Sequence, residues 1–269
     1  MHLYLSADLH QQSLNTGNQQ YSDLEELETA DIFCDLLNQA NIQYTLFFTG
    51  RCFIEHTELA TRLSQHPNAS VGGHGWNGFQ PELWHRVCKK LLSSYNGPYW
   101  YQSMDVSKTK AIIEKYSGKT VRVWRNHMYM HGPHTESILA KHNIKLCSDG
   151  VAKNQSLPLS HPDGIFNYPL NIMPDHEHIY HAERTVEWVE EWQARYNWRD
   201  DFGPESYPIE QWCEIVLAQI DQAVLENKNI NMLIHPITMY LADDFKSLRR
   251  IIDKIKLLDS CWLEDAVTQ

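Results

Sequence analysis

Short apolar runs that stop at glycine or at polar residues alternate along the chain with segments whose apolar residues recur every three or four positions. Residues 44–48 form one such run, which closes at Thr49, and residues 69–71 form another, which stops at Gly72. Runs of this kind predict buried strands, and the spacing of Leu59, Ala60 and Leu63 between them predicts a helix. A strand, a helix and a strand in so few residues predict parallel neighbours in a sheet.

The same alternation extends over the rest of the sequence. Further strands are expected at 3–8, 121–124, 144–147, 165–168 and 230–234, further helices at 24–40, 83–91, 111–117, 209–226 and 248–255, and loops at 11–23 and 99–101. We find no linker, repeat or low-complexity tract. The pattern therefore predicts one α/β domain over residues 1–269.

Polar residues follow several of the predicted strands directly. Parallel strands carry their chemistry at the carboxyl ends, so residues at these ends are expected to meet at one edge of the sheet. The residues delivered there are Asp8, His10, His74, Arg125, His127 and His235.

Asp8 and His10 are two residues apart at the end of the first strand, so their side chains face the same side. This arrangement suits a metal ligand next to a general base. The plainer alternative is a carboxylate that caps a turn and a surface histidine. Arg125 near Asp8 would hold that carboxylate ionised. The alternative is an ordinary structural ion pair, which would look identical in the sequence.

Two other segments carry candidate chemistry. Trp76 lies in a glycine-rich loop beside His74 and is a candidate to stack on a sugar ring; the alternative is a loop that packs on itself. Residues 175–178, which read Asp-His-Glu-His, are either the rim of the active site or a second metal site, but they lack the spacing of a known zinc motif.

Composition narrows the function classes. The formal net charge is -11 with no basic run, which argues against nucleic acid or an anionic membrane as the main partner. The six cysteines have no paired spacing and are expected to be free thiols. The sequence shows no leader and no run of eighteen apolar residues, so we expect a cytoplasmic protein without a transmembrane segment.

In the order and spacing of these pieces the chain resembles the polysaccharide deacetylase superfamily. The resemblance implies an α/β fold of the incomplete (β/α)7 barrel type and one divalent metal, with zinc as the first candidate. It also implies removal of an acyl group from an amino sugar. The matching pieces are 6–10, 44–51, 71–78, 123–125 through 148–149, and 233–236.

The resemblance also implies roles for individual residues. Asp8 would be the general base and His74 a metal ligand. Arg125 would orient the base, and His235 would be the general acid.

The chain departs from the family pattern at two positions. Leu9 occupies the place of the metal-binding aspartate, and Gly78 occupies the place of the second metal-binding histidine. We expect His10 to replace the first and His127 to be the third ligand. The alternatives for the third ligand are Asp8, Asn77, His176 and His178.

The sequence looks most similar to the branch associated with capsule and lipopolysaccharide gene clusters. We therefore expect a metal-dependent hydrolase that removes an acetyl or formyl group from an amino sugar on a nucleotide-linked or lipid-linked precursor. Trp76, Asn77 and Asp175 are the candidates for contact with the sugar. The alternatives are a non-catalytic sugar-binding protein on a degenerate deacetylase scaffold and, ranked last, a metal-dependent phosphoesterase or amidohydrolase.

Overall fold

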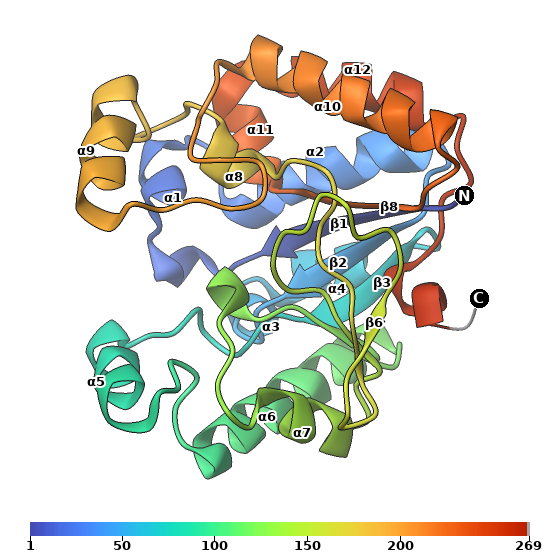
Figure 1. Ribbon diagram of the computed structural model, residues 1–269. Helices are drawn as coiled ribbons and strands as arrows, with labels where there is room; N and C mark the ends of the chain where they lie inside the picture. The colour runs from blue at the N-terminus through green and yellow to red at the C-terminus, as the bar shows by residue number, and fades with distance from the viewer. Residues whose placement is uncertain (268–269) are drawn as a thin grey trace.

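The computed structural model describes residues 1–267 and contains one curled sheet of eight strands (Figure 1). The order across the sheet is β6-β7-β5-β4-β3-β2-β1-β8, and every neighbouring pair is parallel except the β6–β7 pair. The strands are β1 (Leu3–Leu9), β2 (Tyr44–Phe48), β3 (Ala69–Gly73), β4 (Val123–Trp124), β5 (Leu146–Cys147), β6 (Leu159–Ser160), β7 (Phe166–Asn167) and β8 (Ile230–Ile234).

Helices surround the curled sheet (Figure 1). α2 (Glu26–Gln39), α10 (Ile209–Leu225), α11 (Pro236–Asp243) and α12 (Lys246–Ile255) lie above it in the view, and α6 (Tyr99–Ser117) and α7 (Thr135–Lys141) lie below. α4 (Thr57–Gln65) packs against both α2 and α6. The remaining helical segments are α1 (Gly17–Tyr21), α3 (Cys52–Glu55), α5 (Glu82–Leu92), α8 (Asp175–His178), α9 (Val186–Tyr196), η1 (Gln12–Leu14), η2 (His127–Tyr129) and η3 (Leu263–Val267). Seven parallel strands with helices around them confirm the expected incomplete (β/α)7 barrel.

The two ends of the parallel sheet are joined by amide groups instead of a strand ladder. The Asn231 backbone N–H donates to Asn171 Oδ1 at 2.8 Å, and the Asn171 backbone N–H donates to the Asn231 carbonyl at 3.1 Å. The Asn231 side chain, which is fully buried, also donates to the Tyr168 carbonyl at 2.8 Å. These bonds connect β8 to the segment that follows β7 and satisfy backbone groups that would otherwise be buried without partners.

Close packing at the end of β3 depends on glycine. A Cβ atom on Gly73 would lie 2.1 Å from the ring of Trp124, which is almost fully buried on the neighbouring strand β4. The missing side chain therefore lets the Trp124 ring pack against the β3 backbone one residue before His74.

Two segments expected as loops contain helix. Residues 99–101 form the first turn of α6, which begins directly after Pro98 and so starts twelve residues before the predicted helix. The buried side of α6 includes Gln102, Thr109 and Ser117. These polar residues hide the helical period from a search for apolar spacing. The segment 11–23 likewise contains η1 and α1.

We predict that Asn231→Ala lowers the free energy of unfolding by about 2–4 kcal/mol. The substitution removes the side-chain donor and leaves the Tyr168 carbonyl buried without that bond, at roughly 1–3 kcal/mol for each lost partner. Urea denaturation followed by circular dichroism measures the change. Asn154→Ala, at an exposed position, is the matched control and should stay within about 0.5 kcal/mol of the parent. An equal effect of the two substitutions would show that the amide junction does not hold the barrel together.

Candidate active site

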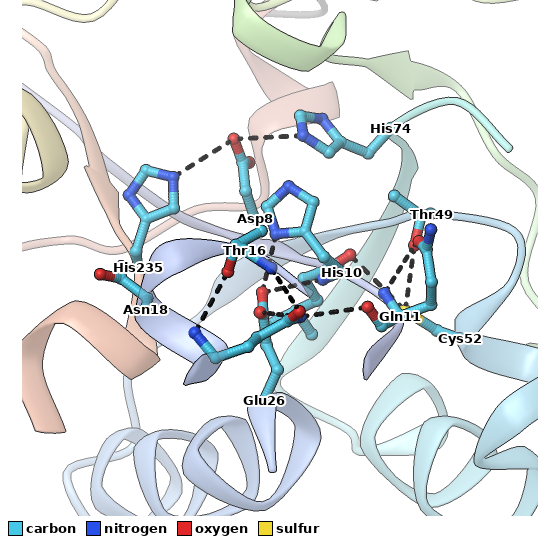
Figure 2. Close-up of polar contacts among 12 residues, drawn as sticks. Asp8, His10, Gln11, Thr16, Asn18, Glu26, Thr49, Cys52, His74 and His235 are labelled. Atoms are coloured by element: carbon cyan, nitrogen blue, oxygen red, sulfur yellow. Dashed lines mark hydrogen bonds and ion pairs between the residues drawn. The ribbon is translucent and has the colours of Figure 1, made fainter. Parts of the chain in front are cut away.

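The end of β1 brings two of the predicted residues into one space. Asp8 is the last residue but one of β1 and His10 follows the strand directly. Figure 2 shows the Asp8 carboxylate between the rings of His74 and His235, with His10 close beside them. Asp8 Oδ2 lies 3.8 Å from His74 Nε2 and 3.9 Å from His235 Nε2.

Three imidazole rings converge next to this carboxylate. His127 Nδ1 lies 3.3 Å from His10 Nε2 and 3.2 Å from His74 Nε2, and the three ligand atoms are all within 4.8 Å of one another. The rings meet edge to face, with centroids 5.1–5.2 Å apart. The structure thus groups His127 with His10 and His74, as the sequence predicted.

Hydrogen bonds on the far side of two of these rings decide where their lone pairs point. His10 Nδ1 lies 2.7 Å from a carboxylate oxygen of Glu26, and His74 Nδ1 lies 2.9 Å from the carbonyl of Arg125. Both partners are acceptors, so each Nδ1 carries the proton and each Nε2 presents a lone pair toward the other rings. Burial lowers the pKa of His74 to about 4, which keeps that ring neutral.

This arrangement fits a bound divalent cation. Lone pairs that face one another across a small space are unfavourable without a cation between them. Nitrogen ligands at about 2.0–2.1 Å in a tetrahedron are about 3.3 Å apart, close to the spacings that His127 makes with His10 and His74. Three histidines leave the fourth position of a tetrahedron open, as in catalytic zinc sites.

The two departures from the family pattern have physical reasons. The Leu9 side chain is fully buried in the core and points away from the site, so His10 takes over on the side that faces it. At Gly78 the backbone has φ +63°, and a Cβ atom would lie 2.8 Å from Leu14. A ligand side chain at position 78 is therefore disfavoured.

His127 is placed by a short turn after β4. The backbone N–H of Asn126 donates to Asp149 Oδ1 at 2.8 Å, and the Asn126 side chain donates to Asp149 Oδ2 at 2.6 Å. The next two residues, Met128 and Tyr129, have φ of 54° and 52°, values that L residues rarely adopt. The anchored asparagine and this tight turn hold the His127 ring against His10 and His74.

Arg125 fixes Asp8 in a buried ion pair. Its Nη1 donates to Asp8 Oδ1 at 2.8 Å, its Nη2 donates to the hydroxyls of Ser6 and Ser148, and its Nε donates to the Ser148 carbonyl. The Arg125 side chain is fully buried, with its guanidinium 4.3 Å from the centre of the Phe47 ring. Burial alone would raise the pKa of Asp8, but Arg125 holds that pKa well below its usual range.

His235 is held in the opposite charge state. Its Nδ1 lies 2.7 Å from Asp175 Oδ1, and its backbone N–H donates to Asp175 Oδ2 at 2.6 Å. Although burial lowers the pKa of His235, the carboxylates of Asp175, Asp8 and Glu177 raise it to about 9. Asp175 itself is fully buried. We therefore expect Asp175 to act through His235. Contact between Asp175 and the sugar, which was expected from the sequence, is not favoured by this burial.

A small cavity of about 30 Å³ lies beside His74 and His127 and is also lined by Trp76 and Asn77, whereas Asp8, His10 and His235 are not among its lining residues. The Trp76 ring packs on Gly50, and Lys108 Nζ lies 3.4 Å from its centre, so the ring already has packing partners within the protein. The Asn77 side chain donates to the Gln80 carbonyl at 2.7 Å. Both residues border the pocket, and their contact with a sugar stays a prediction.

Two of the other candidates for the third ligand, His176 and His178, lie outside the cluster of three histidines. His176 lies beside His235 with ring centroids 5.4 Å apart, and His178 pairs with Asp200 at 3.0 Å. Glu26, which holds His10, was not among the residues expected at the site, although it lies in the predicted helix 24–40. The unusual run of acids over residues 25–28 was the available signal.

Comparison with known proteins supports the fold assignment. The polysaccharide deacetylase family model matches residues 23–146. No curated protein matches the chain.

Solved structures match over 99% of the chain. A protein from Mycobacterium smegmatis assigned as a polysaccharide deacetylase has a TM-score of 0.66 at 15% identity, with 89% of that chain covered. Puue allantoinase has a TM-score of 0.65 at 11% identity, again with 89% covered. A CE4 family pseudoenzyme from Bacillus anthracis has a TM-score of 0.52 at 13% identity, with 65% covered. Residues 23–146 therefore match the polysaccharide deacetylase family, and the chain as a whole has the polysaccharide deacetylase fold.

Proposed function

We propose that this protein is a metal-dependent hydrolase that removes an acetyl or formyl group from the nitrogen of an amino sugar. The observation that carries the proposal is the convergence of three histidine nitrogens beside an ionised aspartate and a protonated histidine. Amide hydrolysis needs a base for the attacking water and an acid for the departing amine. Both groups are present next to one candidate cation site.

His10, His74 and His127 would hold the metal, with zinc as the first candidate. A divalent cation at such a site polarises a carbonyl and makes a water molecule more acidic. Glu26 and the Arg125 carbonyl keep two of the rings in the tautomer that presents Nε2. Partners of this kind typically decide both ligand orientation and affinity.

Asp8 would accept the proton of the attacking water. Because Arg125 occupies Oδ1, the second oxygen, Oδ2, is the one that faces His74 and His235. His235 would then donate the proton of its Nε2 to the nitrogen of the leaving amine. Asp175 keeps that proton in place at neutral pH by raising the pKa of His235.

The substrate we propose is an N-acylated amino sugar in a nucleotide-linked or lipid-linked precursor of a surface glycan, as in the capsule and lipopolysaccharide branch. The supporting observation is the position of Trp76 and Asn77, which line the same small cavity as His74 and His127 and so lie next to the histidine cluster. These two side chains would contact the sugar.

A non-catalytic sugar-binding role is the second candidate. A structural neighbour with this fold is a pseudoenzyme, and Leu9 and Gly78 depart from the family pattern. The intact Asp8, Arg125 and His235 favour the enzyme, because a binding relic has no need for a base and an acid in opposite charge states.

We predict that the purified protein holds about one equivalent of a divalent metal and that His127→Ala loses most of it. Removing one of three protein ligands typically lowers affinity strongly. Elemental analysis of dialysed protein measures the content directly. His142→Ala, which removes a partly buried histidine bonded to Ser103, is the control and should keep its metal. Full occupancy in His127→Ala would remove that residue from the ligand set.

We predict release of acetate or formate from nucleotide-linked N-acyl amino sugars, and a fall in turnover of roughly 10²-fold or more in Asp8→Asn. The amide keeps the size of the carboxylate but cannot accept a proton. Mass spectrometry of a panel with chitin oligomers and peptidoglycan fragments measures the products, and metal analysis confirms that the variant is loaded. Release from polymers alone would defeat the precursor assignment, and release from none of the substrates would favour the binding protein.

We predict that activity falls above about pH 9 in the parent and that Asp175→Asn moves this alkaline limb at least one unit lower. A general acid must be protonated, and the amide no longer raises the pKa of His235. The pH profile of kcat measures the limb. Asp200→Asn, which breaks the similar pair with His178, should leave it in place. An unmoved limb in Asp175→Asn would exclude His235 as the titrating acid.

A further inference from the structure

Helix α5 and the first turns of α6 expose a continuous set of large apolar side chains. Leu83 is 74% exposed, Leu91 73% and Trp100 62%. We call this surface the α5–α6 patch and define it by Leu83, Trp84, Val87, Leu91, Leu92, Tyr99, Trp100 and Met104, all of which are exposed.

The side of α5 that faces solvent is its apolar side. Leu83, Val87 and Leu91 recur every four residues and therefore share one face of the helix. The α5 residues that are buried are His85 and Cys88. An amphipathic helix on a globular body normally turns its apolar stripe inward, so this orientation indicates a surface that is covered by something else.

Aromatic contacts join the two helices into one surface. Trp84 and Tyr101 have ring centroids 5.9 Å apart, and Tyr101 and Trp100 have centroids 5.8 Å apart. Tyr99, at the start of α6, has Lys141 Nζ 5.6 Å from its ring centre. Tryptophan and tyrosine are the residues enriched where a protein meets the headgroup level of a membrane.

Basic residues surround the apolar stripe. Arg86, Lys89 and Lys90 are exposed on α5, whose one acidic residue is Glu82. The helix therefore carries a net charge of +2 in a chain whose formal net charge is -11. The overall acidity had argued against an anionic membrane partner, but charge acts locally because screening limits its range to about 8–10 Å.

The patch adjoins the candidate active site. His85, on the buried side of α5, lines the same pocket as His74 and His127. In Figure 1, α5 stands apart from the body on the side toward which β1 points, which is the carboxyl edge of the sheet. A surface bound to the patch would therefore lie close to the pocket.

We propose that the α5–α6 patch binds the surface of an anionic phospholipid bilayer. The leucines and Val87 would enter the boundary between headgroups and acyl chains, Trp84 and Trp100 would lie at headgroup level, and the basic residues would contact lipid phosphates. This mode of binding needs no membrane-spanning helix, and none of the helices within residues 1–267 is long and apolar enough to be one.

The surface also narrows the substrate class. If the protein acts on an N-acylated amino sugar, as proposed above, the patch places the pocket next to the bilayer that would carry a lipid-linked sugar. This consequence rests on the proposed function, whereas the binding of the bilayer does not.

Vesicle co-sedimentation of the metal-loaded full chain tests the proposal. We expect binding to vesicles of phosphatidylcholine with about one quarter phosphatidylglycerol, weaker binding to pure phosphatidylcholine, and a decrease with salt. The double variant Lys89→Gln with Lys90→Gln should bind about 30-fold more weakly, since each basic residue near the surface contributes about fivefold. Lys246→Gln with Arg249→Gln, two exposed basic residues of α12, is the charge control.

Two double variants, one in the patch and one outside it, test the apolar part of the patch. Leu83→Gln with Leu91→Gln should lose binding by tenfold or more, and Leu225→Gln with Leu257→Gln should bind as the parent does, because those two leucines are each 80% exposed outside the patch. All four positions are exposed, so unchanged thermal unfolding curves should verify that the variants fold. Acid release from a water-soluble nucleotide-linked sugar should stay at the parent level in each variant.

Three results would overturn the proposal. The first is a failure of the parent to sediment with anionic vesicles, and the second is an equal loss of binding in the patch and control variants. The third is a stable dimer by light scattering that Leu83→Gln with Leu91→Gln converts to a monomer, because the patch would then be covered by a second copy. Lipid binding and acid release are measured separately, so failure of one is distinguishable from failure of the other.

Discussion

The buried ion pair between Arg125 and Asp8 is the interaction on which the rest of the site depends. Breaking a buried pair by removing one partner commonly costs about 3–5 kcal/mol, because the remaining charge is left without compensation. Here Ser6 and Ser148 accept the hydrogen bonds that Asp8 does not, so the guanidinium is satisfied inside the barrel. The pair thus connects β1 to the residue that directly follows β4, and it keeps the Asp8 carboxylate ionised in a buried position.

Two groups of opposite charge state follow from this constraint. Asp8, which is buried, stays ionised beside Arg125, while His235, which is partly buried, stays protonated beside Asp175. Each charge is stabilised by a partner on the side away from the shared space. The atoms left without these partners, Asp8 Oδ2 and His235 Nε2, lie 3.9 Å apart and face each other.

The three histidines add a different kind of requirement. Glu26 and the Arg125 carbonyl fix the lone pairs of His10 and His74 inward, so the arrangement is most stable with a cation at its centre. The Arg125 backbone therefore orients a ligand while its side chain orients Asp8. One residue therefore links the candidate cation site to Asp8.

The sequence by itself determined which residues reach the carboxyl edge. Strand periodicity and the order of parallel elements were sufficient to bring Asp8, His10, His74 and His235 together, because both are local or topological properties of the chain. The tertiary structure decided the contacts between distant residues, which sequence spacing does not define. It selected His127 through a turn anchored by Asp149, because that contact joins residues far apart in the sequence. It also turned the apolar stripe of α5 outward, since periodicity defines a face of a helix but not what covers it.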